Sequence, residues 1–169
     1  MKLPLTFLFA ILLFQSLNAQ ERITVEDPEI RFSYELPAGW VTKDDGYYHI
    51  ASPIAEEAAE HISITYFSQA VPDFKDFFEG FVEIQLPSQL TNYQIRGQGK
   101  SRIDGEEAYW VSYTHSNSEN PKVNYACIQY LYPKFGQAFY LTYTAAPAIY
   151  ADGLAAAQSA IWSFQAEAK

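Results

Sequence analysis

The stretch IRFSYELPAGW, residues 30–40, is the part of the sequence that decides the fold class. Its apolar side chains Phe32, Tyr34 and Leu36 alternate with polar ones. Such alternation predicts a β-strand with one buried and one wet face. A proline and a glycine before the final tryptophan predict a tight turn at the end of this strand. We therefore expect the domain to begin with a half-buried strand and a sharp change of direction.

The N-terminus has the features of a secretory signal peptide, which we assign to residues 1–19. A basic start at Met1-Lys2 is followed by an apolar run from Leu3 to Phe14 and a small residue, Ala19. This run is shorter than the about 20 apolar residues that a membrane-spanning helix needs. We expect cleavage near Ala19, a secreted or periplasmic location and no stable membrane insertion.

The remaining chain, about 150 residues long, has the size of one domain. Loss of Lys2 leaves 10 basic and 20 acidic residues, so the net charge changes from −9 to −10. An acidic surface repels phosphate backbones, which argues against nucleic acid as a partner. The single cysteine, Cys127, excludes an intramolecular disulfide and lies in a strand-like run. We interpret it as a small buried hydrophobic residue.

Beyond a leader at residues 20–29, with room for a short edge strand at Ile23 and Val25, we expect one domain over residues 30–165. An Asp-Gly turn at residues 43–46 predicts a hairpin, and a later run of strands with short turns predicts an antiparallel meander. The expected strands after the opening one cover residues 40–42, 47–51, 61–67, 93–103, 107–115, 123–132 and 138–144.

Two segments change to helical periodicity. Residues 73–86 place large apolar side chains three and four positions apart, with Asp73 as the N-cap and Pro87 after the end; these side chains are Phe74, Phe77, Phe78, Phe81 and Ile84. Residues 147–162 form the second expected helix. The fold class is therefore α+β, an antiparallel sheet covered by helices. We expect Trp40, Trp110 and Trp162 to lie in or beside one core.

Several segments together resemble the PsbP-like superfamily, which includes the extrinsic lumenal subunit of photosystem II and a yeast Ran-binding protein. They are FSYELPAGW, IDGEEAYWVSY, FGQAFYLTYTA and the terminal IWSF, spread from Phe32 to Phe164. The resemblance implies a six- or seven-stranded antiparallel sheet sandwiched by helices. It implies no activity and no cofactor, because its motifs are structural and fold alone does not fix function.

No catalytic residues or cofactor-binding motif can be assigned. The histidines His49, His61 and His115 have no nucleophile placed to use them, and no Gly-x-Ser-x-Gly elbow is present. A metal site has one weak candidate, a group of four ligand-type side chains: Glu56, Glu57, Glu60 and His61. A solvated acidic loop explains the same residues, and we favour that interpretation.

Tyrosines concentrate on the expected meander. Two arrangements explain these tyrosines: a sheet covered by other elements on both faces, or a sheet with one face left partly open for a partner. The candidate partner surface comprises Tyr109, Tyr113, Tyr125, Tyr130 and Tyr132. The sequence thus favours a non-enzymatic accessory module that recognises an unknown protein partner. The alternatives are a carrier of a small apolar ligand between helix and sheet and, more remotely, a divalent-cation-binding protein.

Overall fold

A computed structural model describes residues 20–26, 28–44, 48–53, 60–68, 71 and 73–169. The expected signal peptide lies outside these residues. The centre of the fold is a seven-stranded sheet in the order β3-β4-β5-β9-β8-β7-β6, in which every pairing is antiparallel. Its strands are β3 (Trp40–Asp44), β4 (His49–Pro53), β5 (His61–Ser68), β6 (Thr91–Ile103), β7 (Glu106–Ser116), β8 (Asn124–Lys134) and β9 (Gln137–Ala145).

A second, three-stranded sheet contains the opening strand. Strand β2 (Ile30–Glu35) lies between β1 (Arg22–Glu26) and β10 (Gln165–Ala168) and is antiparallel to both. β1 and β10 lie wholly or partly outside the expected limits 30–165. Gly39, at φ 78°, then allows the chain to turn into β3 of the large sheet. Residues 30–40 therefore connect the two sheets.

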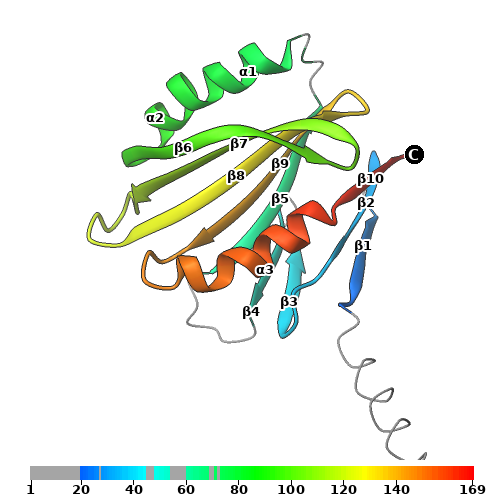
Figure 1. Ribbon diagram of the computed structural model, residues 1–169, viewed down its shortest axis with the longest axis horizontal. Helices are drawn as coiled ribbons and strands as arrows, with labels where there is room; N and C mark the ends of the chain where they lie inside the picture. The colour runs from blue at the N-terminus through cyan, green and yellow to red at the C-terminus, as the bar shows by residue number, and fades with distance from the viewer. Residues whose placement is uncertain (1–19, 27, 45–47, 54–59, 69–70, 72) are drawn as a thin grey trace, which may run out of the picture.

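The elements form three layers (Figure 1). One face of the large sheet carries α1 (Phe74–Gly80), the π-helical segment η2 (Phe81–Gln85) and α2 (Leu86–Gln89). The other face carries α3 (Tyr150–Trp162) and the small sheet. The expectation of an α+β fold with helices on both faces of a seven-stranded antiparallel sheet is confirmed. None of the described helices is long and apolar enough to cross a membrane.

The first helix differs from the prediction in its second half. Asp73 caps it as expected, accepting from the backbone N–H groups of Lys75 and Asp76. The amide of Leu86 donates to the carbonyl of Phe81, five residues back, which is a π-helical bond. This wider turn rotates the residues that follow, so Ile84 is 72% exposed and Leu86 is buried instead. The helix also continues past Pro87, where the prediction had ended it.

The buried apolar residues form one cluster on each face of the large sheet. The α3 side holds β2 and Phe164, and the α1 side holds the phenylalanines of the first helix. Trp40 and Trp110 pack against the α3-side cluster, as expected. The prediction is wrong for Trp162, which is 53% exposed because it ends α3 on the side facing away from the sheet.

Candidate binding site

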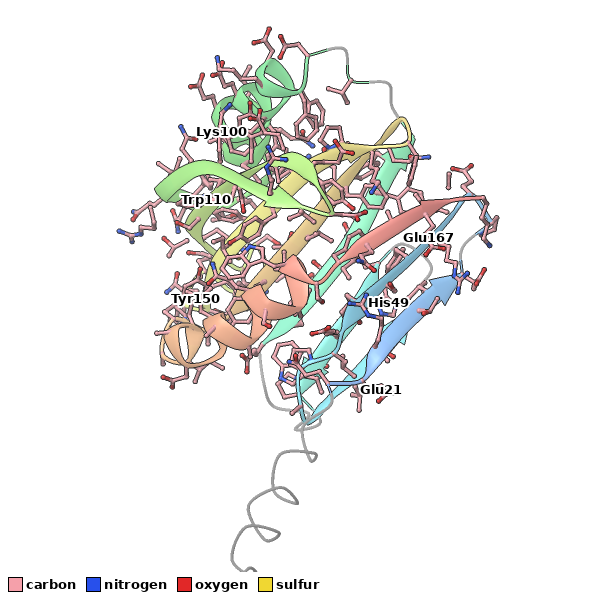
Figure 2. All side chains as sticks on the ribbon, turned by 45° about the vertical axis from the view of Figure 1, so that its right-hand side comes forward. Glu21, His49, Lys100, Trp110, Tyr150 and Glu167 are labelled. Carbon is pink, nitrogen blue, oxygen red and sulfur yellow. The ribbon has the colours of Figure 1, made fainter. Side chains whose placement is uncertain are left out.

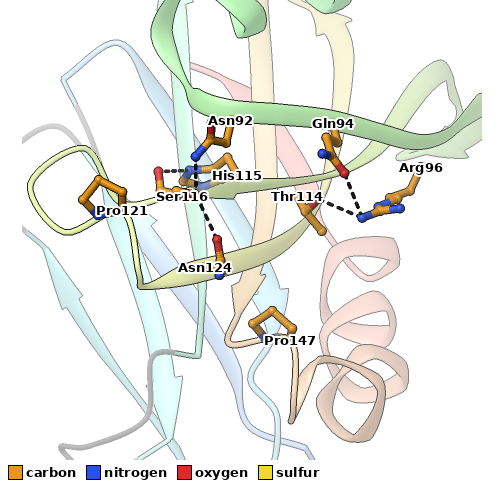
Figure 3. Close-up of a pocket in the computed structure, with 9 residues that line it drawn as sticks. All are labelled: Asn92, Gln94, Arg96, Thr114, His115, Ser116, Pro121, Asn124 and Pro147. Atoms are coloured by element: carbon orange, nitrogen blue, oxygen red, sulfur yellow. Dashed lines mark hydrogen bonds between the residues drawn. The ribbon is translucent and has the colours of Figure 1, made fainter.

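The ends of β6, β7 and β8 next to the start of α3 enclose a polar pocket of about 470 Å³ (Figure 3). The strands supply amide, hydroxyl and guanidinium groups, and the segment before α3 contributes Pro147. The described lining residues are Asn92, Gln94, Arg96, Thr114, His115, Ser116, Pro121, Asn124 and Pro147. The pocket offers many hydrogen-bond donors in a small space.

An irregularity in β6 shapes one side of this pocket. The register between β6 and β7 shifts between Thr91 and Gln94 and again between Ile95 and Gly97. Asn92 has φ 56°, a left-handed conformation that asparagine tolerates better than most residues. Such bulges redirect side chains, and they often lie beside functional sites.

Hydrogen bonds fix the inner polar groups. The Asn92 side-chain amide donates to the Ser116 hydroxyl at 3.1 Å, and Ser116 donates to Asn124 Oδ1 at 2.9 Å. Ser116 is 4% exposed, so its hydroxyl has little access to water and depends on these partners. The Asn124 amide group is the part of this chain of bonds with N–H donors left to offer.

Arg96 supplies the charge of the pocket. Its guanidinium donates to Gln94 Oε1 at 3.1 Å and to the Thr114 hydroxyl at 3.4 Å. None of the ion pairs between described residues includes Arg96. It is also the only Lys, Arg, Asp or Glu among the described lining residues. The pocket is therefore donor-rich and carries one positive charge, within a chain whose net charge is −9.

The five tyrosines expected as one partner surface do not form one, because they are buried on opposite faces of the sheet. Tyr109 and Tyr113 lie under the first helix, and Tyr125 packs beside them, half-buried. Tyr130 and Tyr132 belong to the cluster under α3 and are 2% and 0% exposed.

Internal hydrogen bonds explain how these tyrosines can be buried. The hydroxyl of Tyr109 donates to Glu107 at 2.8 Å, that of Tyr113 to Gln129 at 3.2 Å, and Tyr130 accepts from Gln158 at 2.8 Å. The hydroxyls of Tyr109, Tyr113 and Tyr130 therefore need neither water nor a partner protein, whereas the Tyr132 hydroxyl is buried without a hydrogen-bond partner among the described residues. The structure supports the first of the two interpretations of the aromatic strands, a sheet covered on both faces.

The candidate metal ligands are only partly described, since Glu56 and Glu57 lie outside the described residues. Glu60 accepts a hydrogen bond from the Tyr143 hydroxyl at 2.8 Å, on the α3 side. His61 begins β5 one residue later, and successive side chains of an extended chain point to opposite faces. Glu60 and His61 therefore share no face. The described residues contain no group of three potential metal ligands.

The buried thiol and histidines fit structural roles. Burial raises the pKa of Cys127 to about 11, so the thiolate is scarce at neutral pH and the group is unreactive. The Nε2 atom of His49, between the two sheets, lies 2.8 Å from the Tyr34 hydroxyl (Figure 2). Burial lowers the pKa of His49 and of His61, which favours neutral imidazoles.

Comparison with known proteins identifies the fold. No family model and no curated protein matches the sequence. Among solved structures, the chain is similar to LpqN of Mycobacterium tuberculosis, involved in cell envelope biogenesis, with TM-score 0.63, 15% identity and coverage of 88% of this chain and 92% of LpqN. It is also similar to cyanobacterial PsbP (CyanoP) of Synechocystis, with TM-score 0.59, 13% identity and coverage of 90% and 96%.

A third similar structure is a Pseudomonas aeruginosa protein of unknown function described as a putative regulator. Its TM-score is 0.52 at 14% identity, with coverage of 75% of this chain and 96% of that protein. The chain therefore has the PsbP-like fold, as the sequence resemblance implied. At these identities the similarity establishes the fold alone.

Sequence reasoning missed the pocket residues. Asn92, Gln94, Arg96 and Asn124 follow no known motif, and they become neighbours only when β6, β7 and β8 pair. One signal was available: the segment 91–103 carries three cations and no acid in an acidic chain.

Proposed function

We propose that this protein is an exported, non-enzymatic accessory module that binds a partner protein, and that its polar pocket receives a carboxylate-bearing segment of that partner. The observation that carries the proposal is Arg96, a guanidinium held in the pocket by neutral oxygens. Two of its five N–H groups at most serve these contacts, so a planar carboxylate can still be bound by the remaining donors.

The neighbouring amides support the same ligand chemistry. Asn124 uses its oxygen to accept from Ser116, and this orients its NH₂ group as a donor. A carboxylate accepts several hydrogen bonds at once and gains from a nearby positive charge. Elsewhere the acidic surface repels anions, which concentrates recognition at this pocket.

Export and an accessory role rest on other observations. The sequence pattern of residues 1–19 supports export. Structural neighbours include an envelope biogenesis protein, a cyanobacterial PsbP and a putative regulator, which are consistent with a module that assists other proteins.

The other hypotheses gain less support. The pocket at the ends of β6, β7 and β8 and a second one beside the start of α1 have mixed polar and apolar linings, so these two pockets give a carrier of an apolar ligand no specific support. Of the four candidate ligands for a divalent cation, only Glu60 and His61 lie within the described residues. Their side chains point to opposite faces of the sheet, so these two residues do not support a shared cation site.

Site-specific crosslinking in the source organism tests the proposal. A photoreactive benzoyl-phenylalanine replaces Pro121, which lines the pocket without contacting Arg96 through a hydrogen bond, or, as a control, Thr42 on the opposite edge of the sheet. We expect a discrete adduct with one exported protein from the pocket position and none from the control position. The Arg96→Glu substitution should abolish this adduct.

Arg31→Glu is the matched control because it changes the net charge equally on the small sheet, away from the pocket. It should leave the adduct intact. Adducts that persist in Arg96→Glu, or that disappear equally in Arg31→Glu, would contradict recognition at the pocket. An absence of any adduct at Pro121 would contradict a protein partner.

A further inference from the structure

Strand β6 is a free edge of the large sheet. It pairs with β7 on one side, and no described strand pairs with its other side (Figure 1). It has 13 residues, which at the usual rise per residue span roughly 40 Å. An edge strand presents a row of unpaired backbone N–H and C=O groups, which is a template for another strand.

The charge of β6 distinguishes it from the rest of the chain. Arg96, Lys100 and Arg102 are three of the chain's 11 basic residues, and β6 contains no acid. Lys100 lies on the α1 side, 5.1 Å from the Tyr109 ring centroid, and forms an exposed ion pair with Glu107 at 3.0 Å that an acidic partner side chain would have to share (Figure 2). Arg96 contacts Thr114 on the pocket side. Cations thus project on both faces of this edge.

We infer that β6 binds an extended acidic segment of the partner as an added β-strand. The inference rests on the proposed function and specifies how the partner's segment continues beyond the pocket. Backbone hydrogen bonds would supply affinity, and acidic side chains beside Arg96, Lys100 and Arg102 would supply selectivity.

The regular part of the edge suits this role. Both register irregularities lie before Gly97, so Gly97–Ile103 pairs with β7 without interruption. The neighbouring strand fixes this part of the edge, because the Trp110 ring packs against Gly99, where an added Cβ would lie 3.0 Å from the indole nitrogen. An edge whose pairing with its neighbour is regular needs little ordering when a strand is added.

A second copy of this chain is a poor occupant of the edge. An antiparallel twofold pairing centred on Gly99 would set Arg96 of one copy opposite Arg102 of the other. Like charges directly opposite one another destabilise strand pairing. A basic segment would meet the same repulsion, whereas an acidic segment would not.

Peptide binding to the full mature chain tests the inference. The probes are fluorescein-labelled octapeptides of alternating glutamate and threonine or alternating lysine and threonine, measured by fluorescence anisotropy at low salt. We expect the glutamate peptide to bind at least tenfold more tightly, since three exposed charge pairs each contribute a modest factor. Equal affinities, or no binding at millimolar glutamate peptide, would overturn the inference.

Charge reversal identifies the surface. The triple variant Arg96→Glu, Lys100→Glu, Arg102→Glu should lose the preference for glutamate. A control with reversals at Lys43, Lys75 and Lys169, which has the same net charge, should keep it. Loss of the preference in both variants would assign it to overall charge and not to β6.

Backbone methylation separates strand addition from simple charge attraction. A glutamate peptide N-methylated only at its threonines keeps the donors of one strand edge, whereas a peptide N-methylated at every residue keeps the donors of neither edge. The first peptide should bind and slow amide exchange in β6 about tenfold, and the second should not bind. Equal binding of the two peptides would overturn edge pairing. The crosslinking at Pro121 would still judge the proposed function separately.

Discussion

Substitution of Gly153 by alanine is a test of the packing between α3 and the large sheet. Gly153 lies in the first turns of α3, and a Cβ added there would overlap the Glu60 carboxylate and the Tyr143 hydroxyl. Tyr143 is fully buried, and its hydroxyl donates to Glu60 at 2.8 Å. An alanine must therefore displace the one flexible neighbour, the Glu60 side chain, and press on a rigid ring.

The magnitude follows from three opposing effects. Alanine gains up to about 1 kcal/mol over glycine within a helix. Loss of a buried hydrogen bond to a charged group costs about 1.5–3 kcal/mol, and forcing a methyl into a packed site costs about 1 kcal/mol or more. The free energy of unfolding should therefore fall by about 2 kcal/mol in Gly153→Ala, measured from the urea midpoint at constant m-value.

Two controls make this test specific. Gly80→Ala, in a helix with nothing within 4 Å of the added Cβ, should raise the stability by about 0.5–1 kcal/mol. In a Tyr143→Phe background the hydroxyl is gone, so Gly153→Ala should cost less than about 1 kcal/mol. A Gly153→Ala protein as stable as the wild type, or an equal loss in both backgrounds, would refute the packing argument.

Three further predictions concern buried polar groups. Asp104→Asn should lower the free energy of unfolding by about 3 kcal/mol in urea titrations, because it leaves the mostly buried Lys134 ammonium without its counter-charge; a Lys134→Met background should remove most of this loss. Burial lowers the pKa of His49 and His61 in the folded protein. Below the ordinary histidine pKa of about 6.5, the unfolded chain therefore binds more protons at these two residues than the folded protein does. Stability should therefore fall as the pH drops from about 7 to 5, and replacing both histidines by glutamine should flatten this dependence in thermal melts. Ellman's reagent should leave Cys127 unmodified in the native protein and modify it in urea, and rapid native-state modification would contradict its burial.

Local patterns predicted most of the fold. The alternation in 61–67 predicted β5, and the strand-like runs at 107–115, 123–132 and 138–144, separated by short connections, predicted β7, β8 and β9 as antiparallel neighbours. The first helix was correct as far as Phe81. It failed beyond that residue because periodicity assumes a regular α-helix, and a π-turn shifts the phase.

The candidate site could not be predicted from local patterns. Tyr109 and Tyr130 were grouped because both belong to the meander, although they lie on opposite faces. Tyrosine composition does not reveal whether a hydroxyl meets water or a buried partner, and Gln158, the partner of Tyr130, is 28 residues away. The pocket around Arg96 needs three strands paired in register, which no window of sequence contains.

The sequence by itself determined the fold class and most of the segments that become strands, because alternation and turn residues act over a few neighbouring positions. It also placed IRFSYELPAGW at the head of the domain. Only the tertiary structure decided that this stretch joins two sheets, since β2 also pairs with β10, whose residues lie more than 100 positions further along the chain. The tertiary structure also decided which tyrosines are buried, that β6 is an edge strand, and which side chains of β6, β7 and β8 meet in the pocket around Arg96.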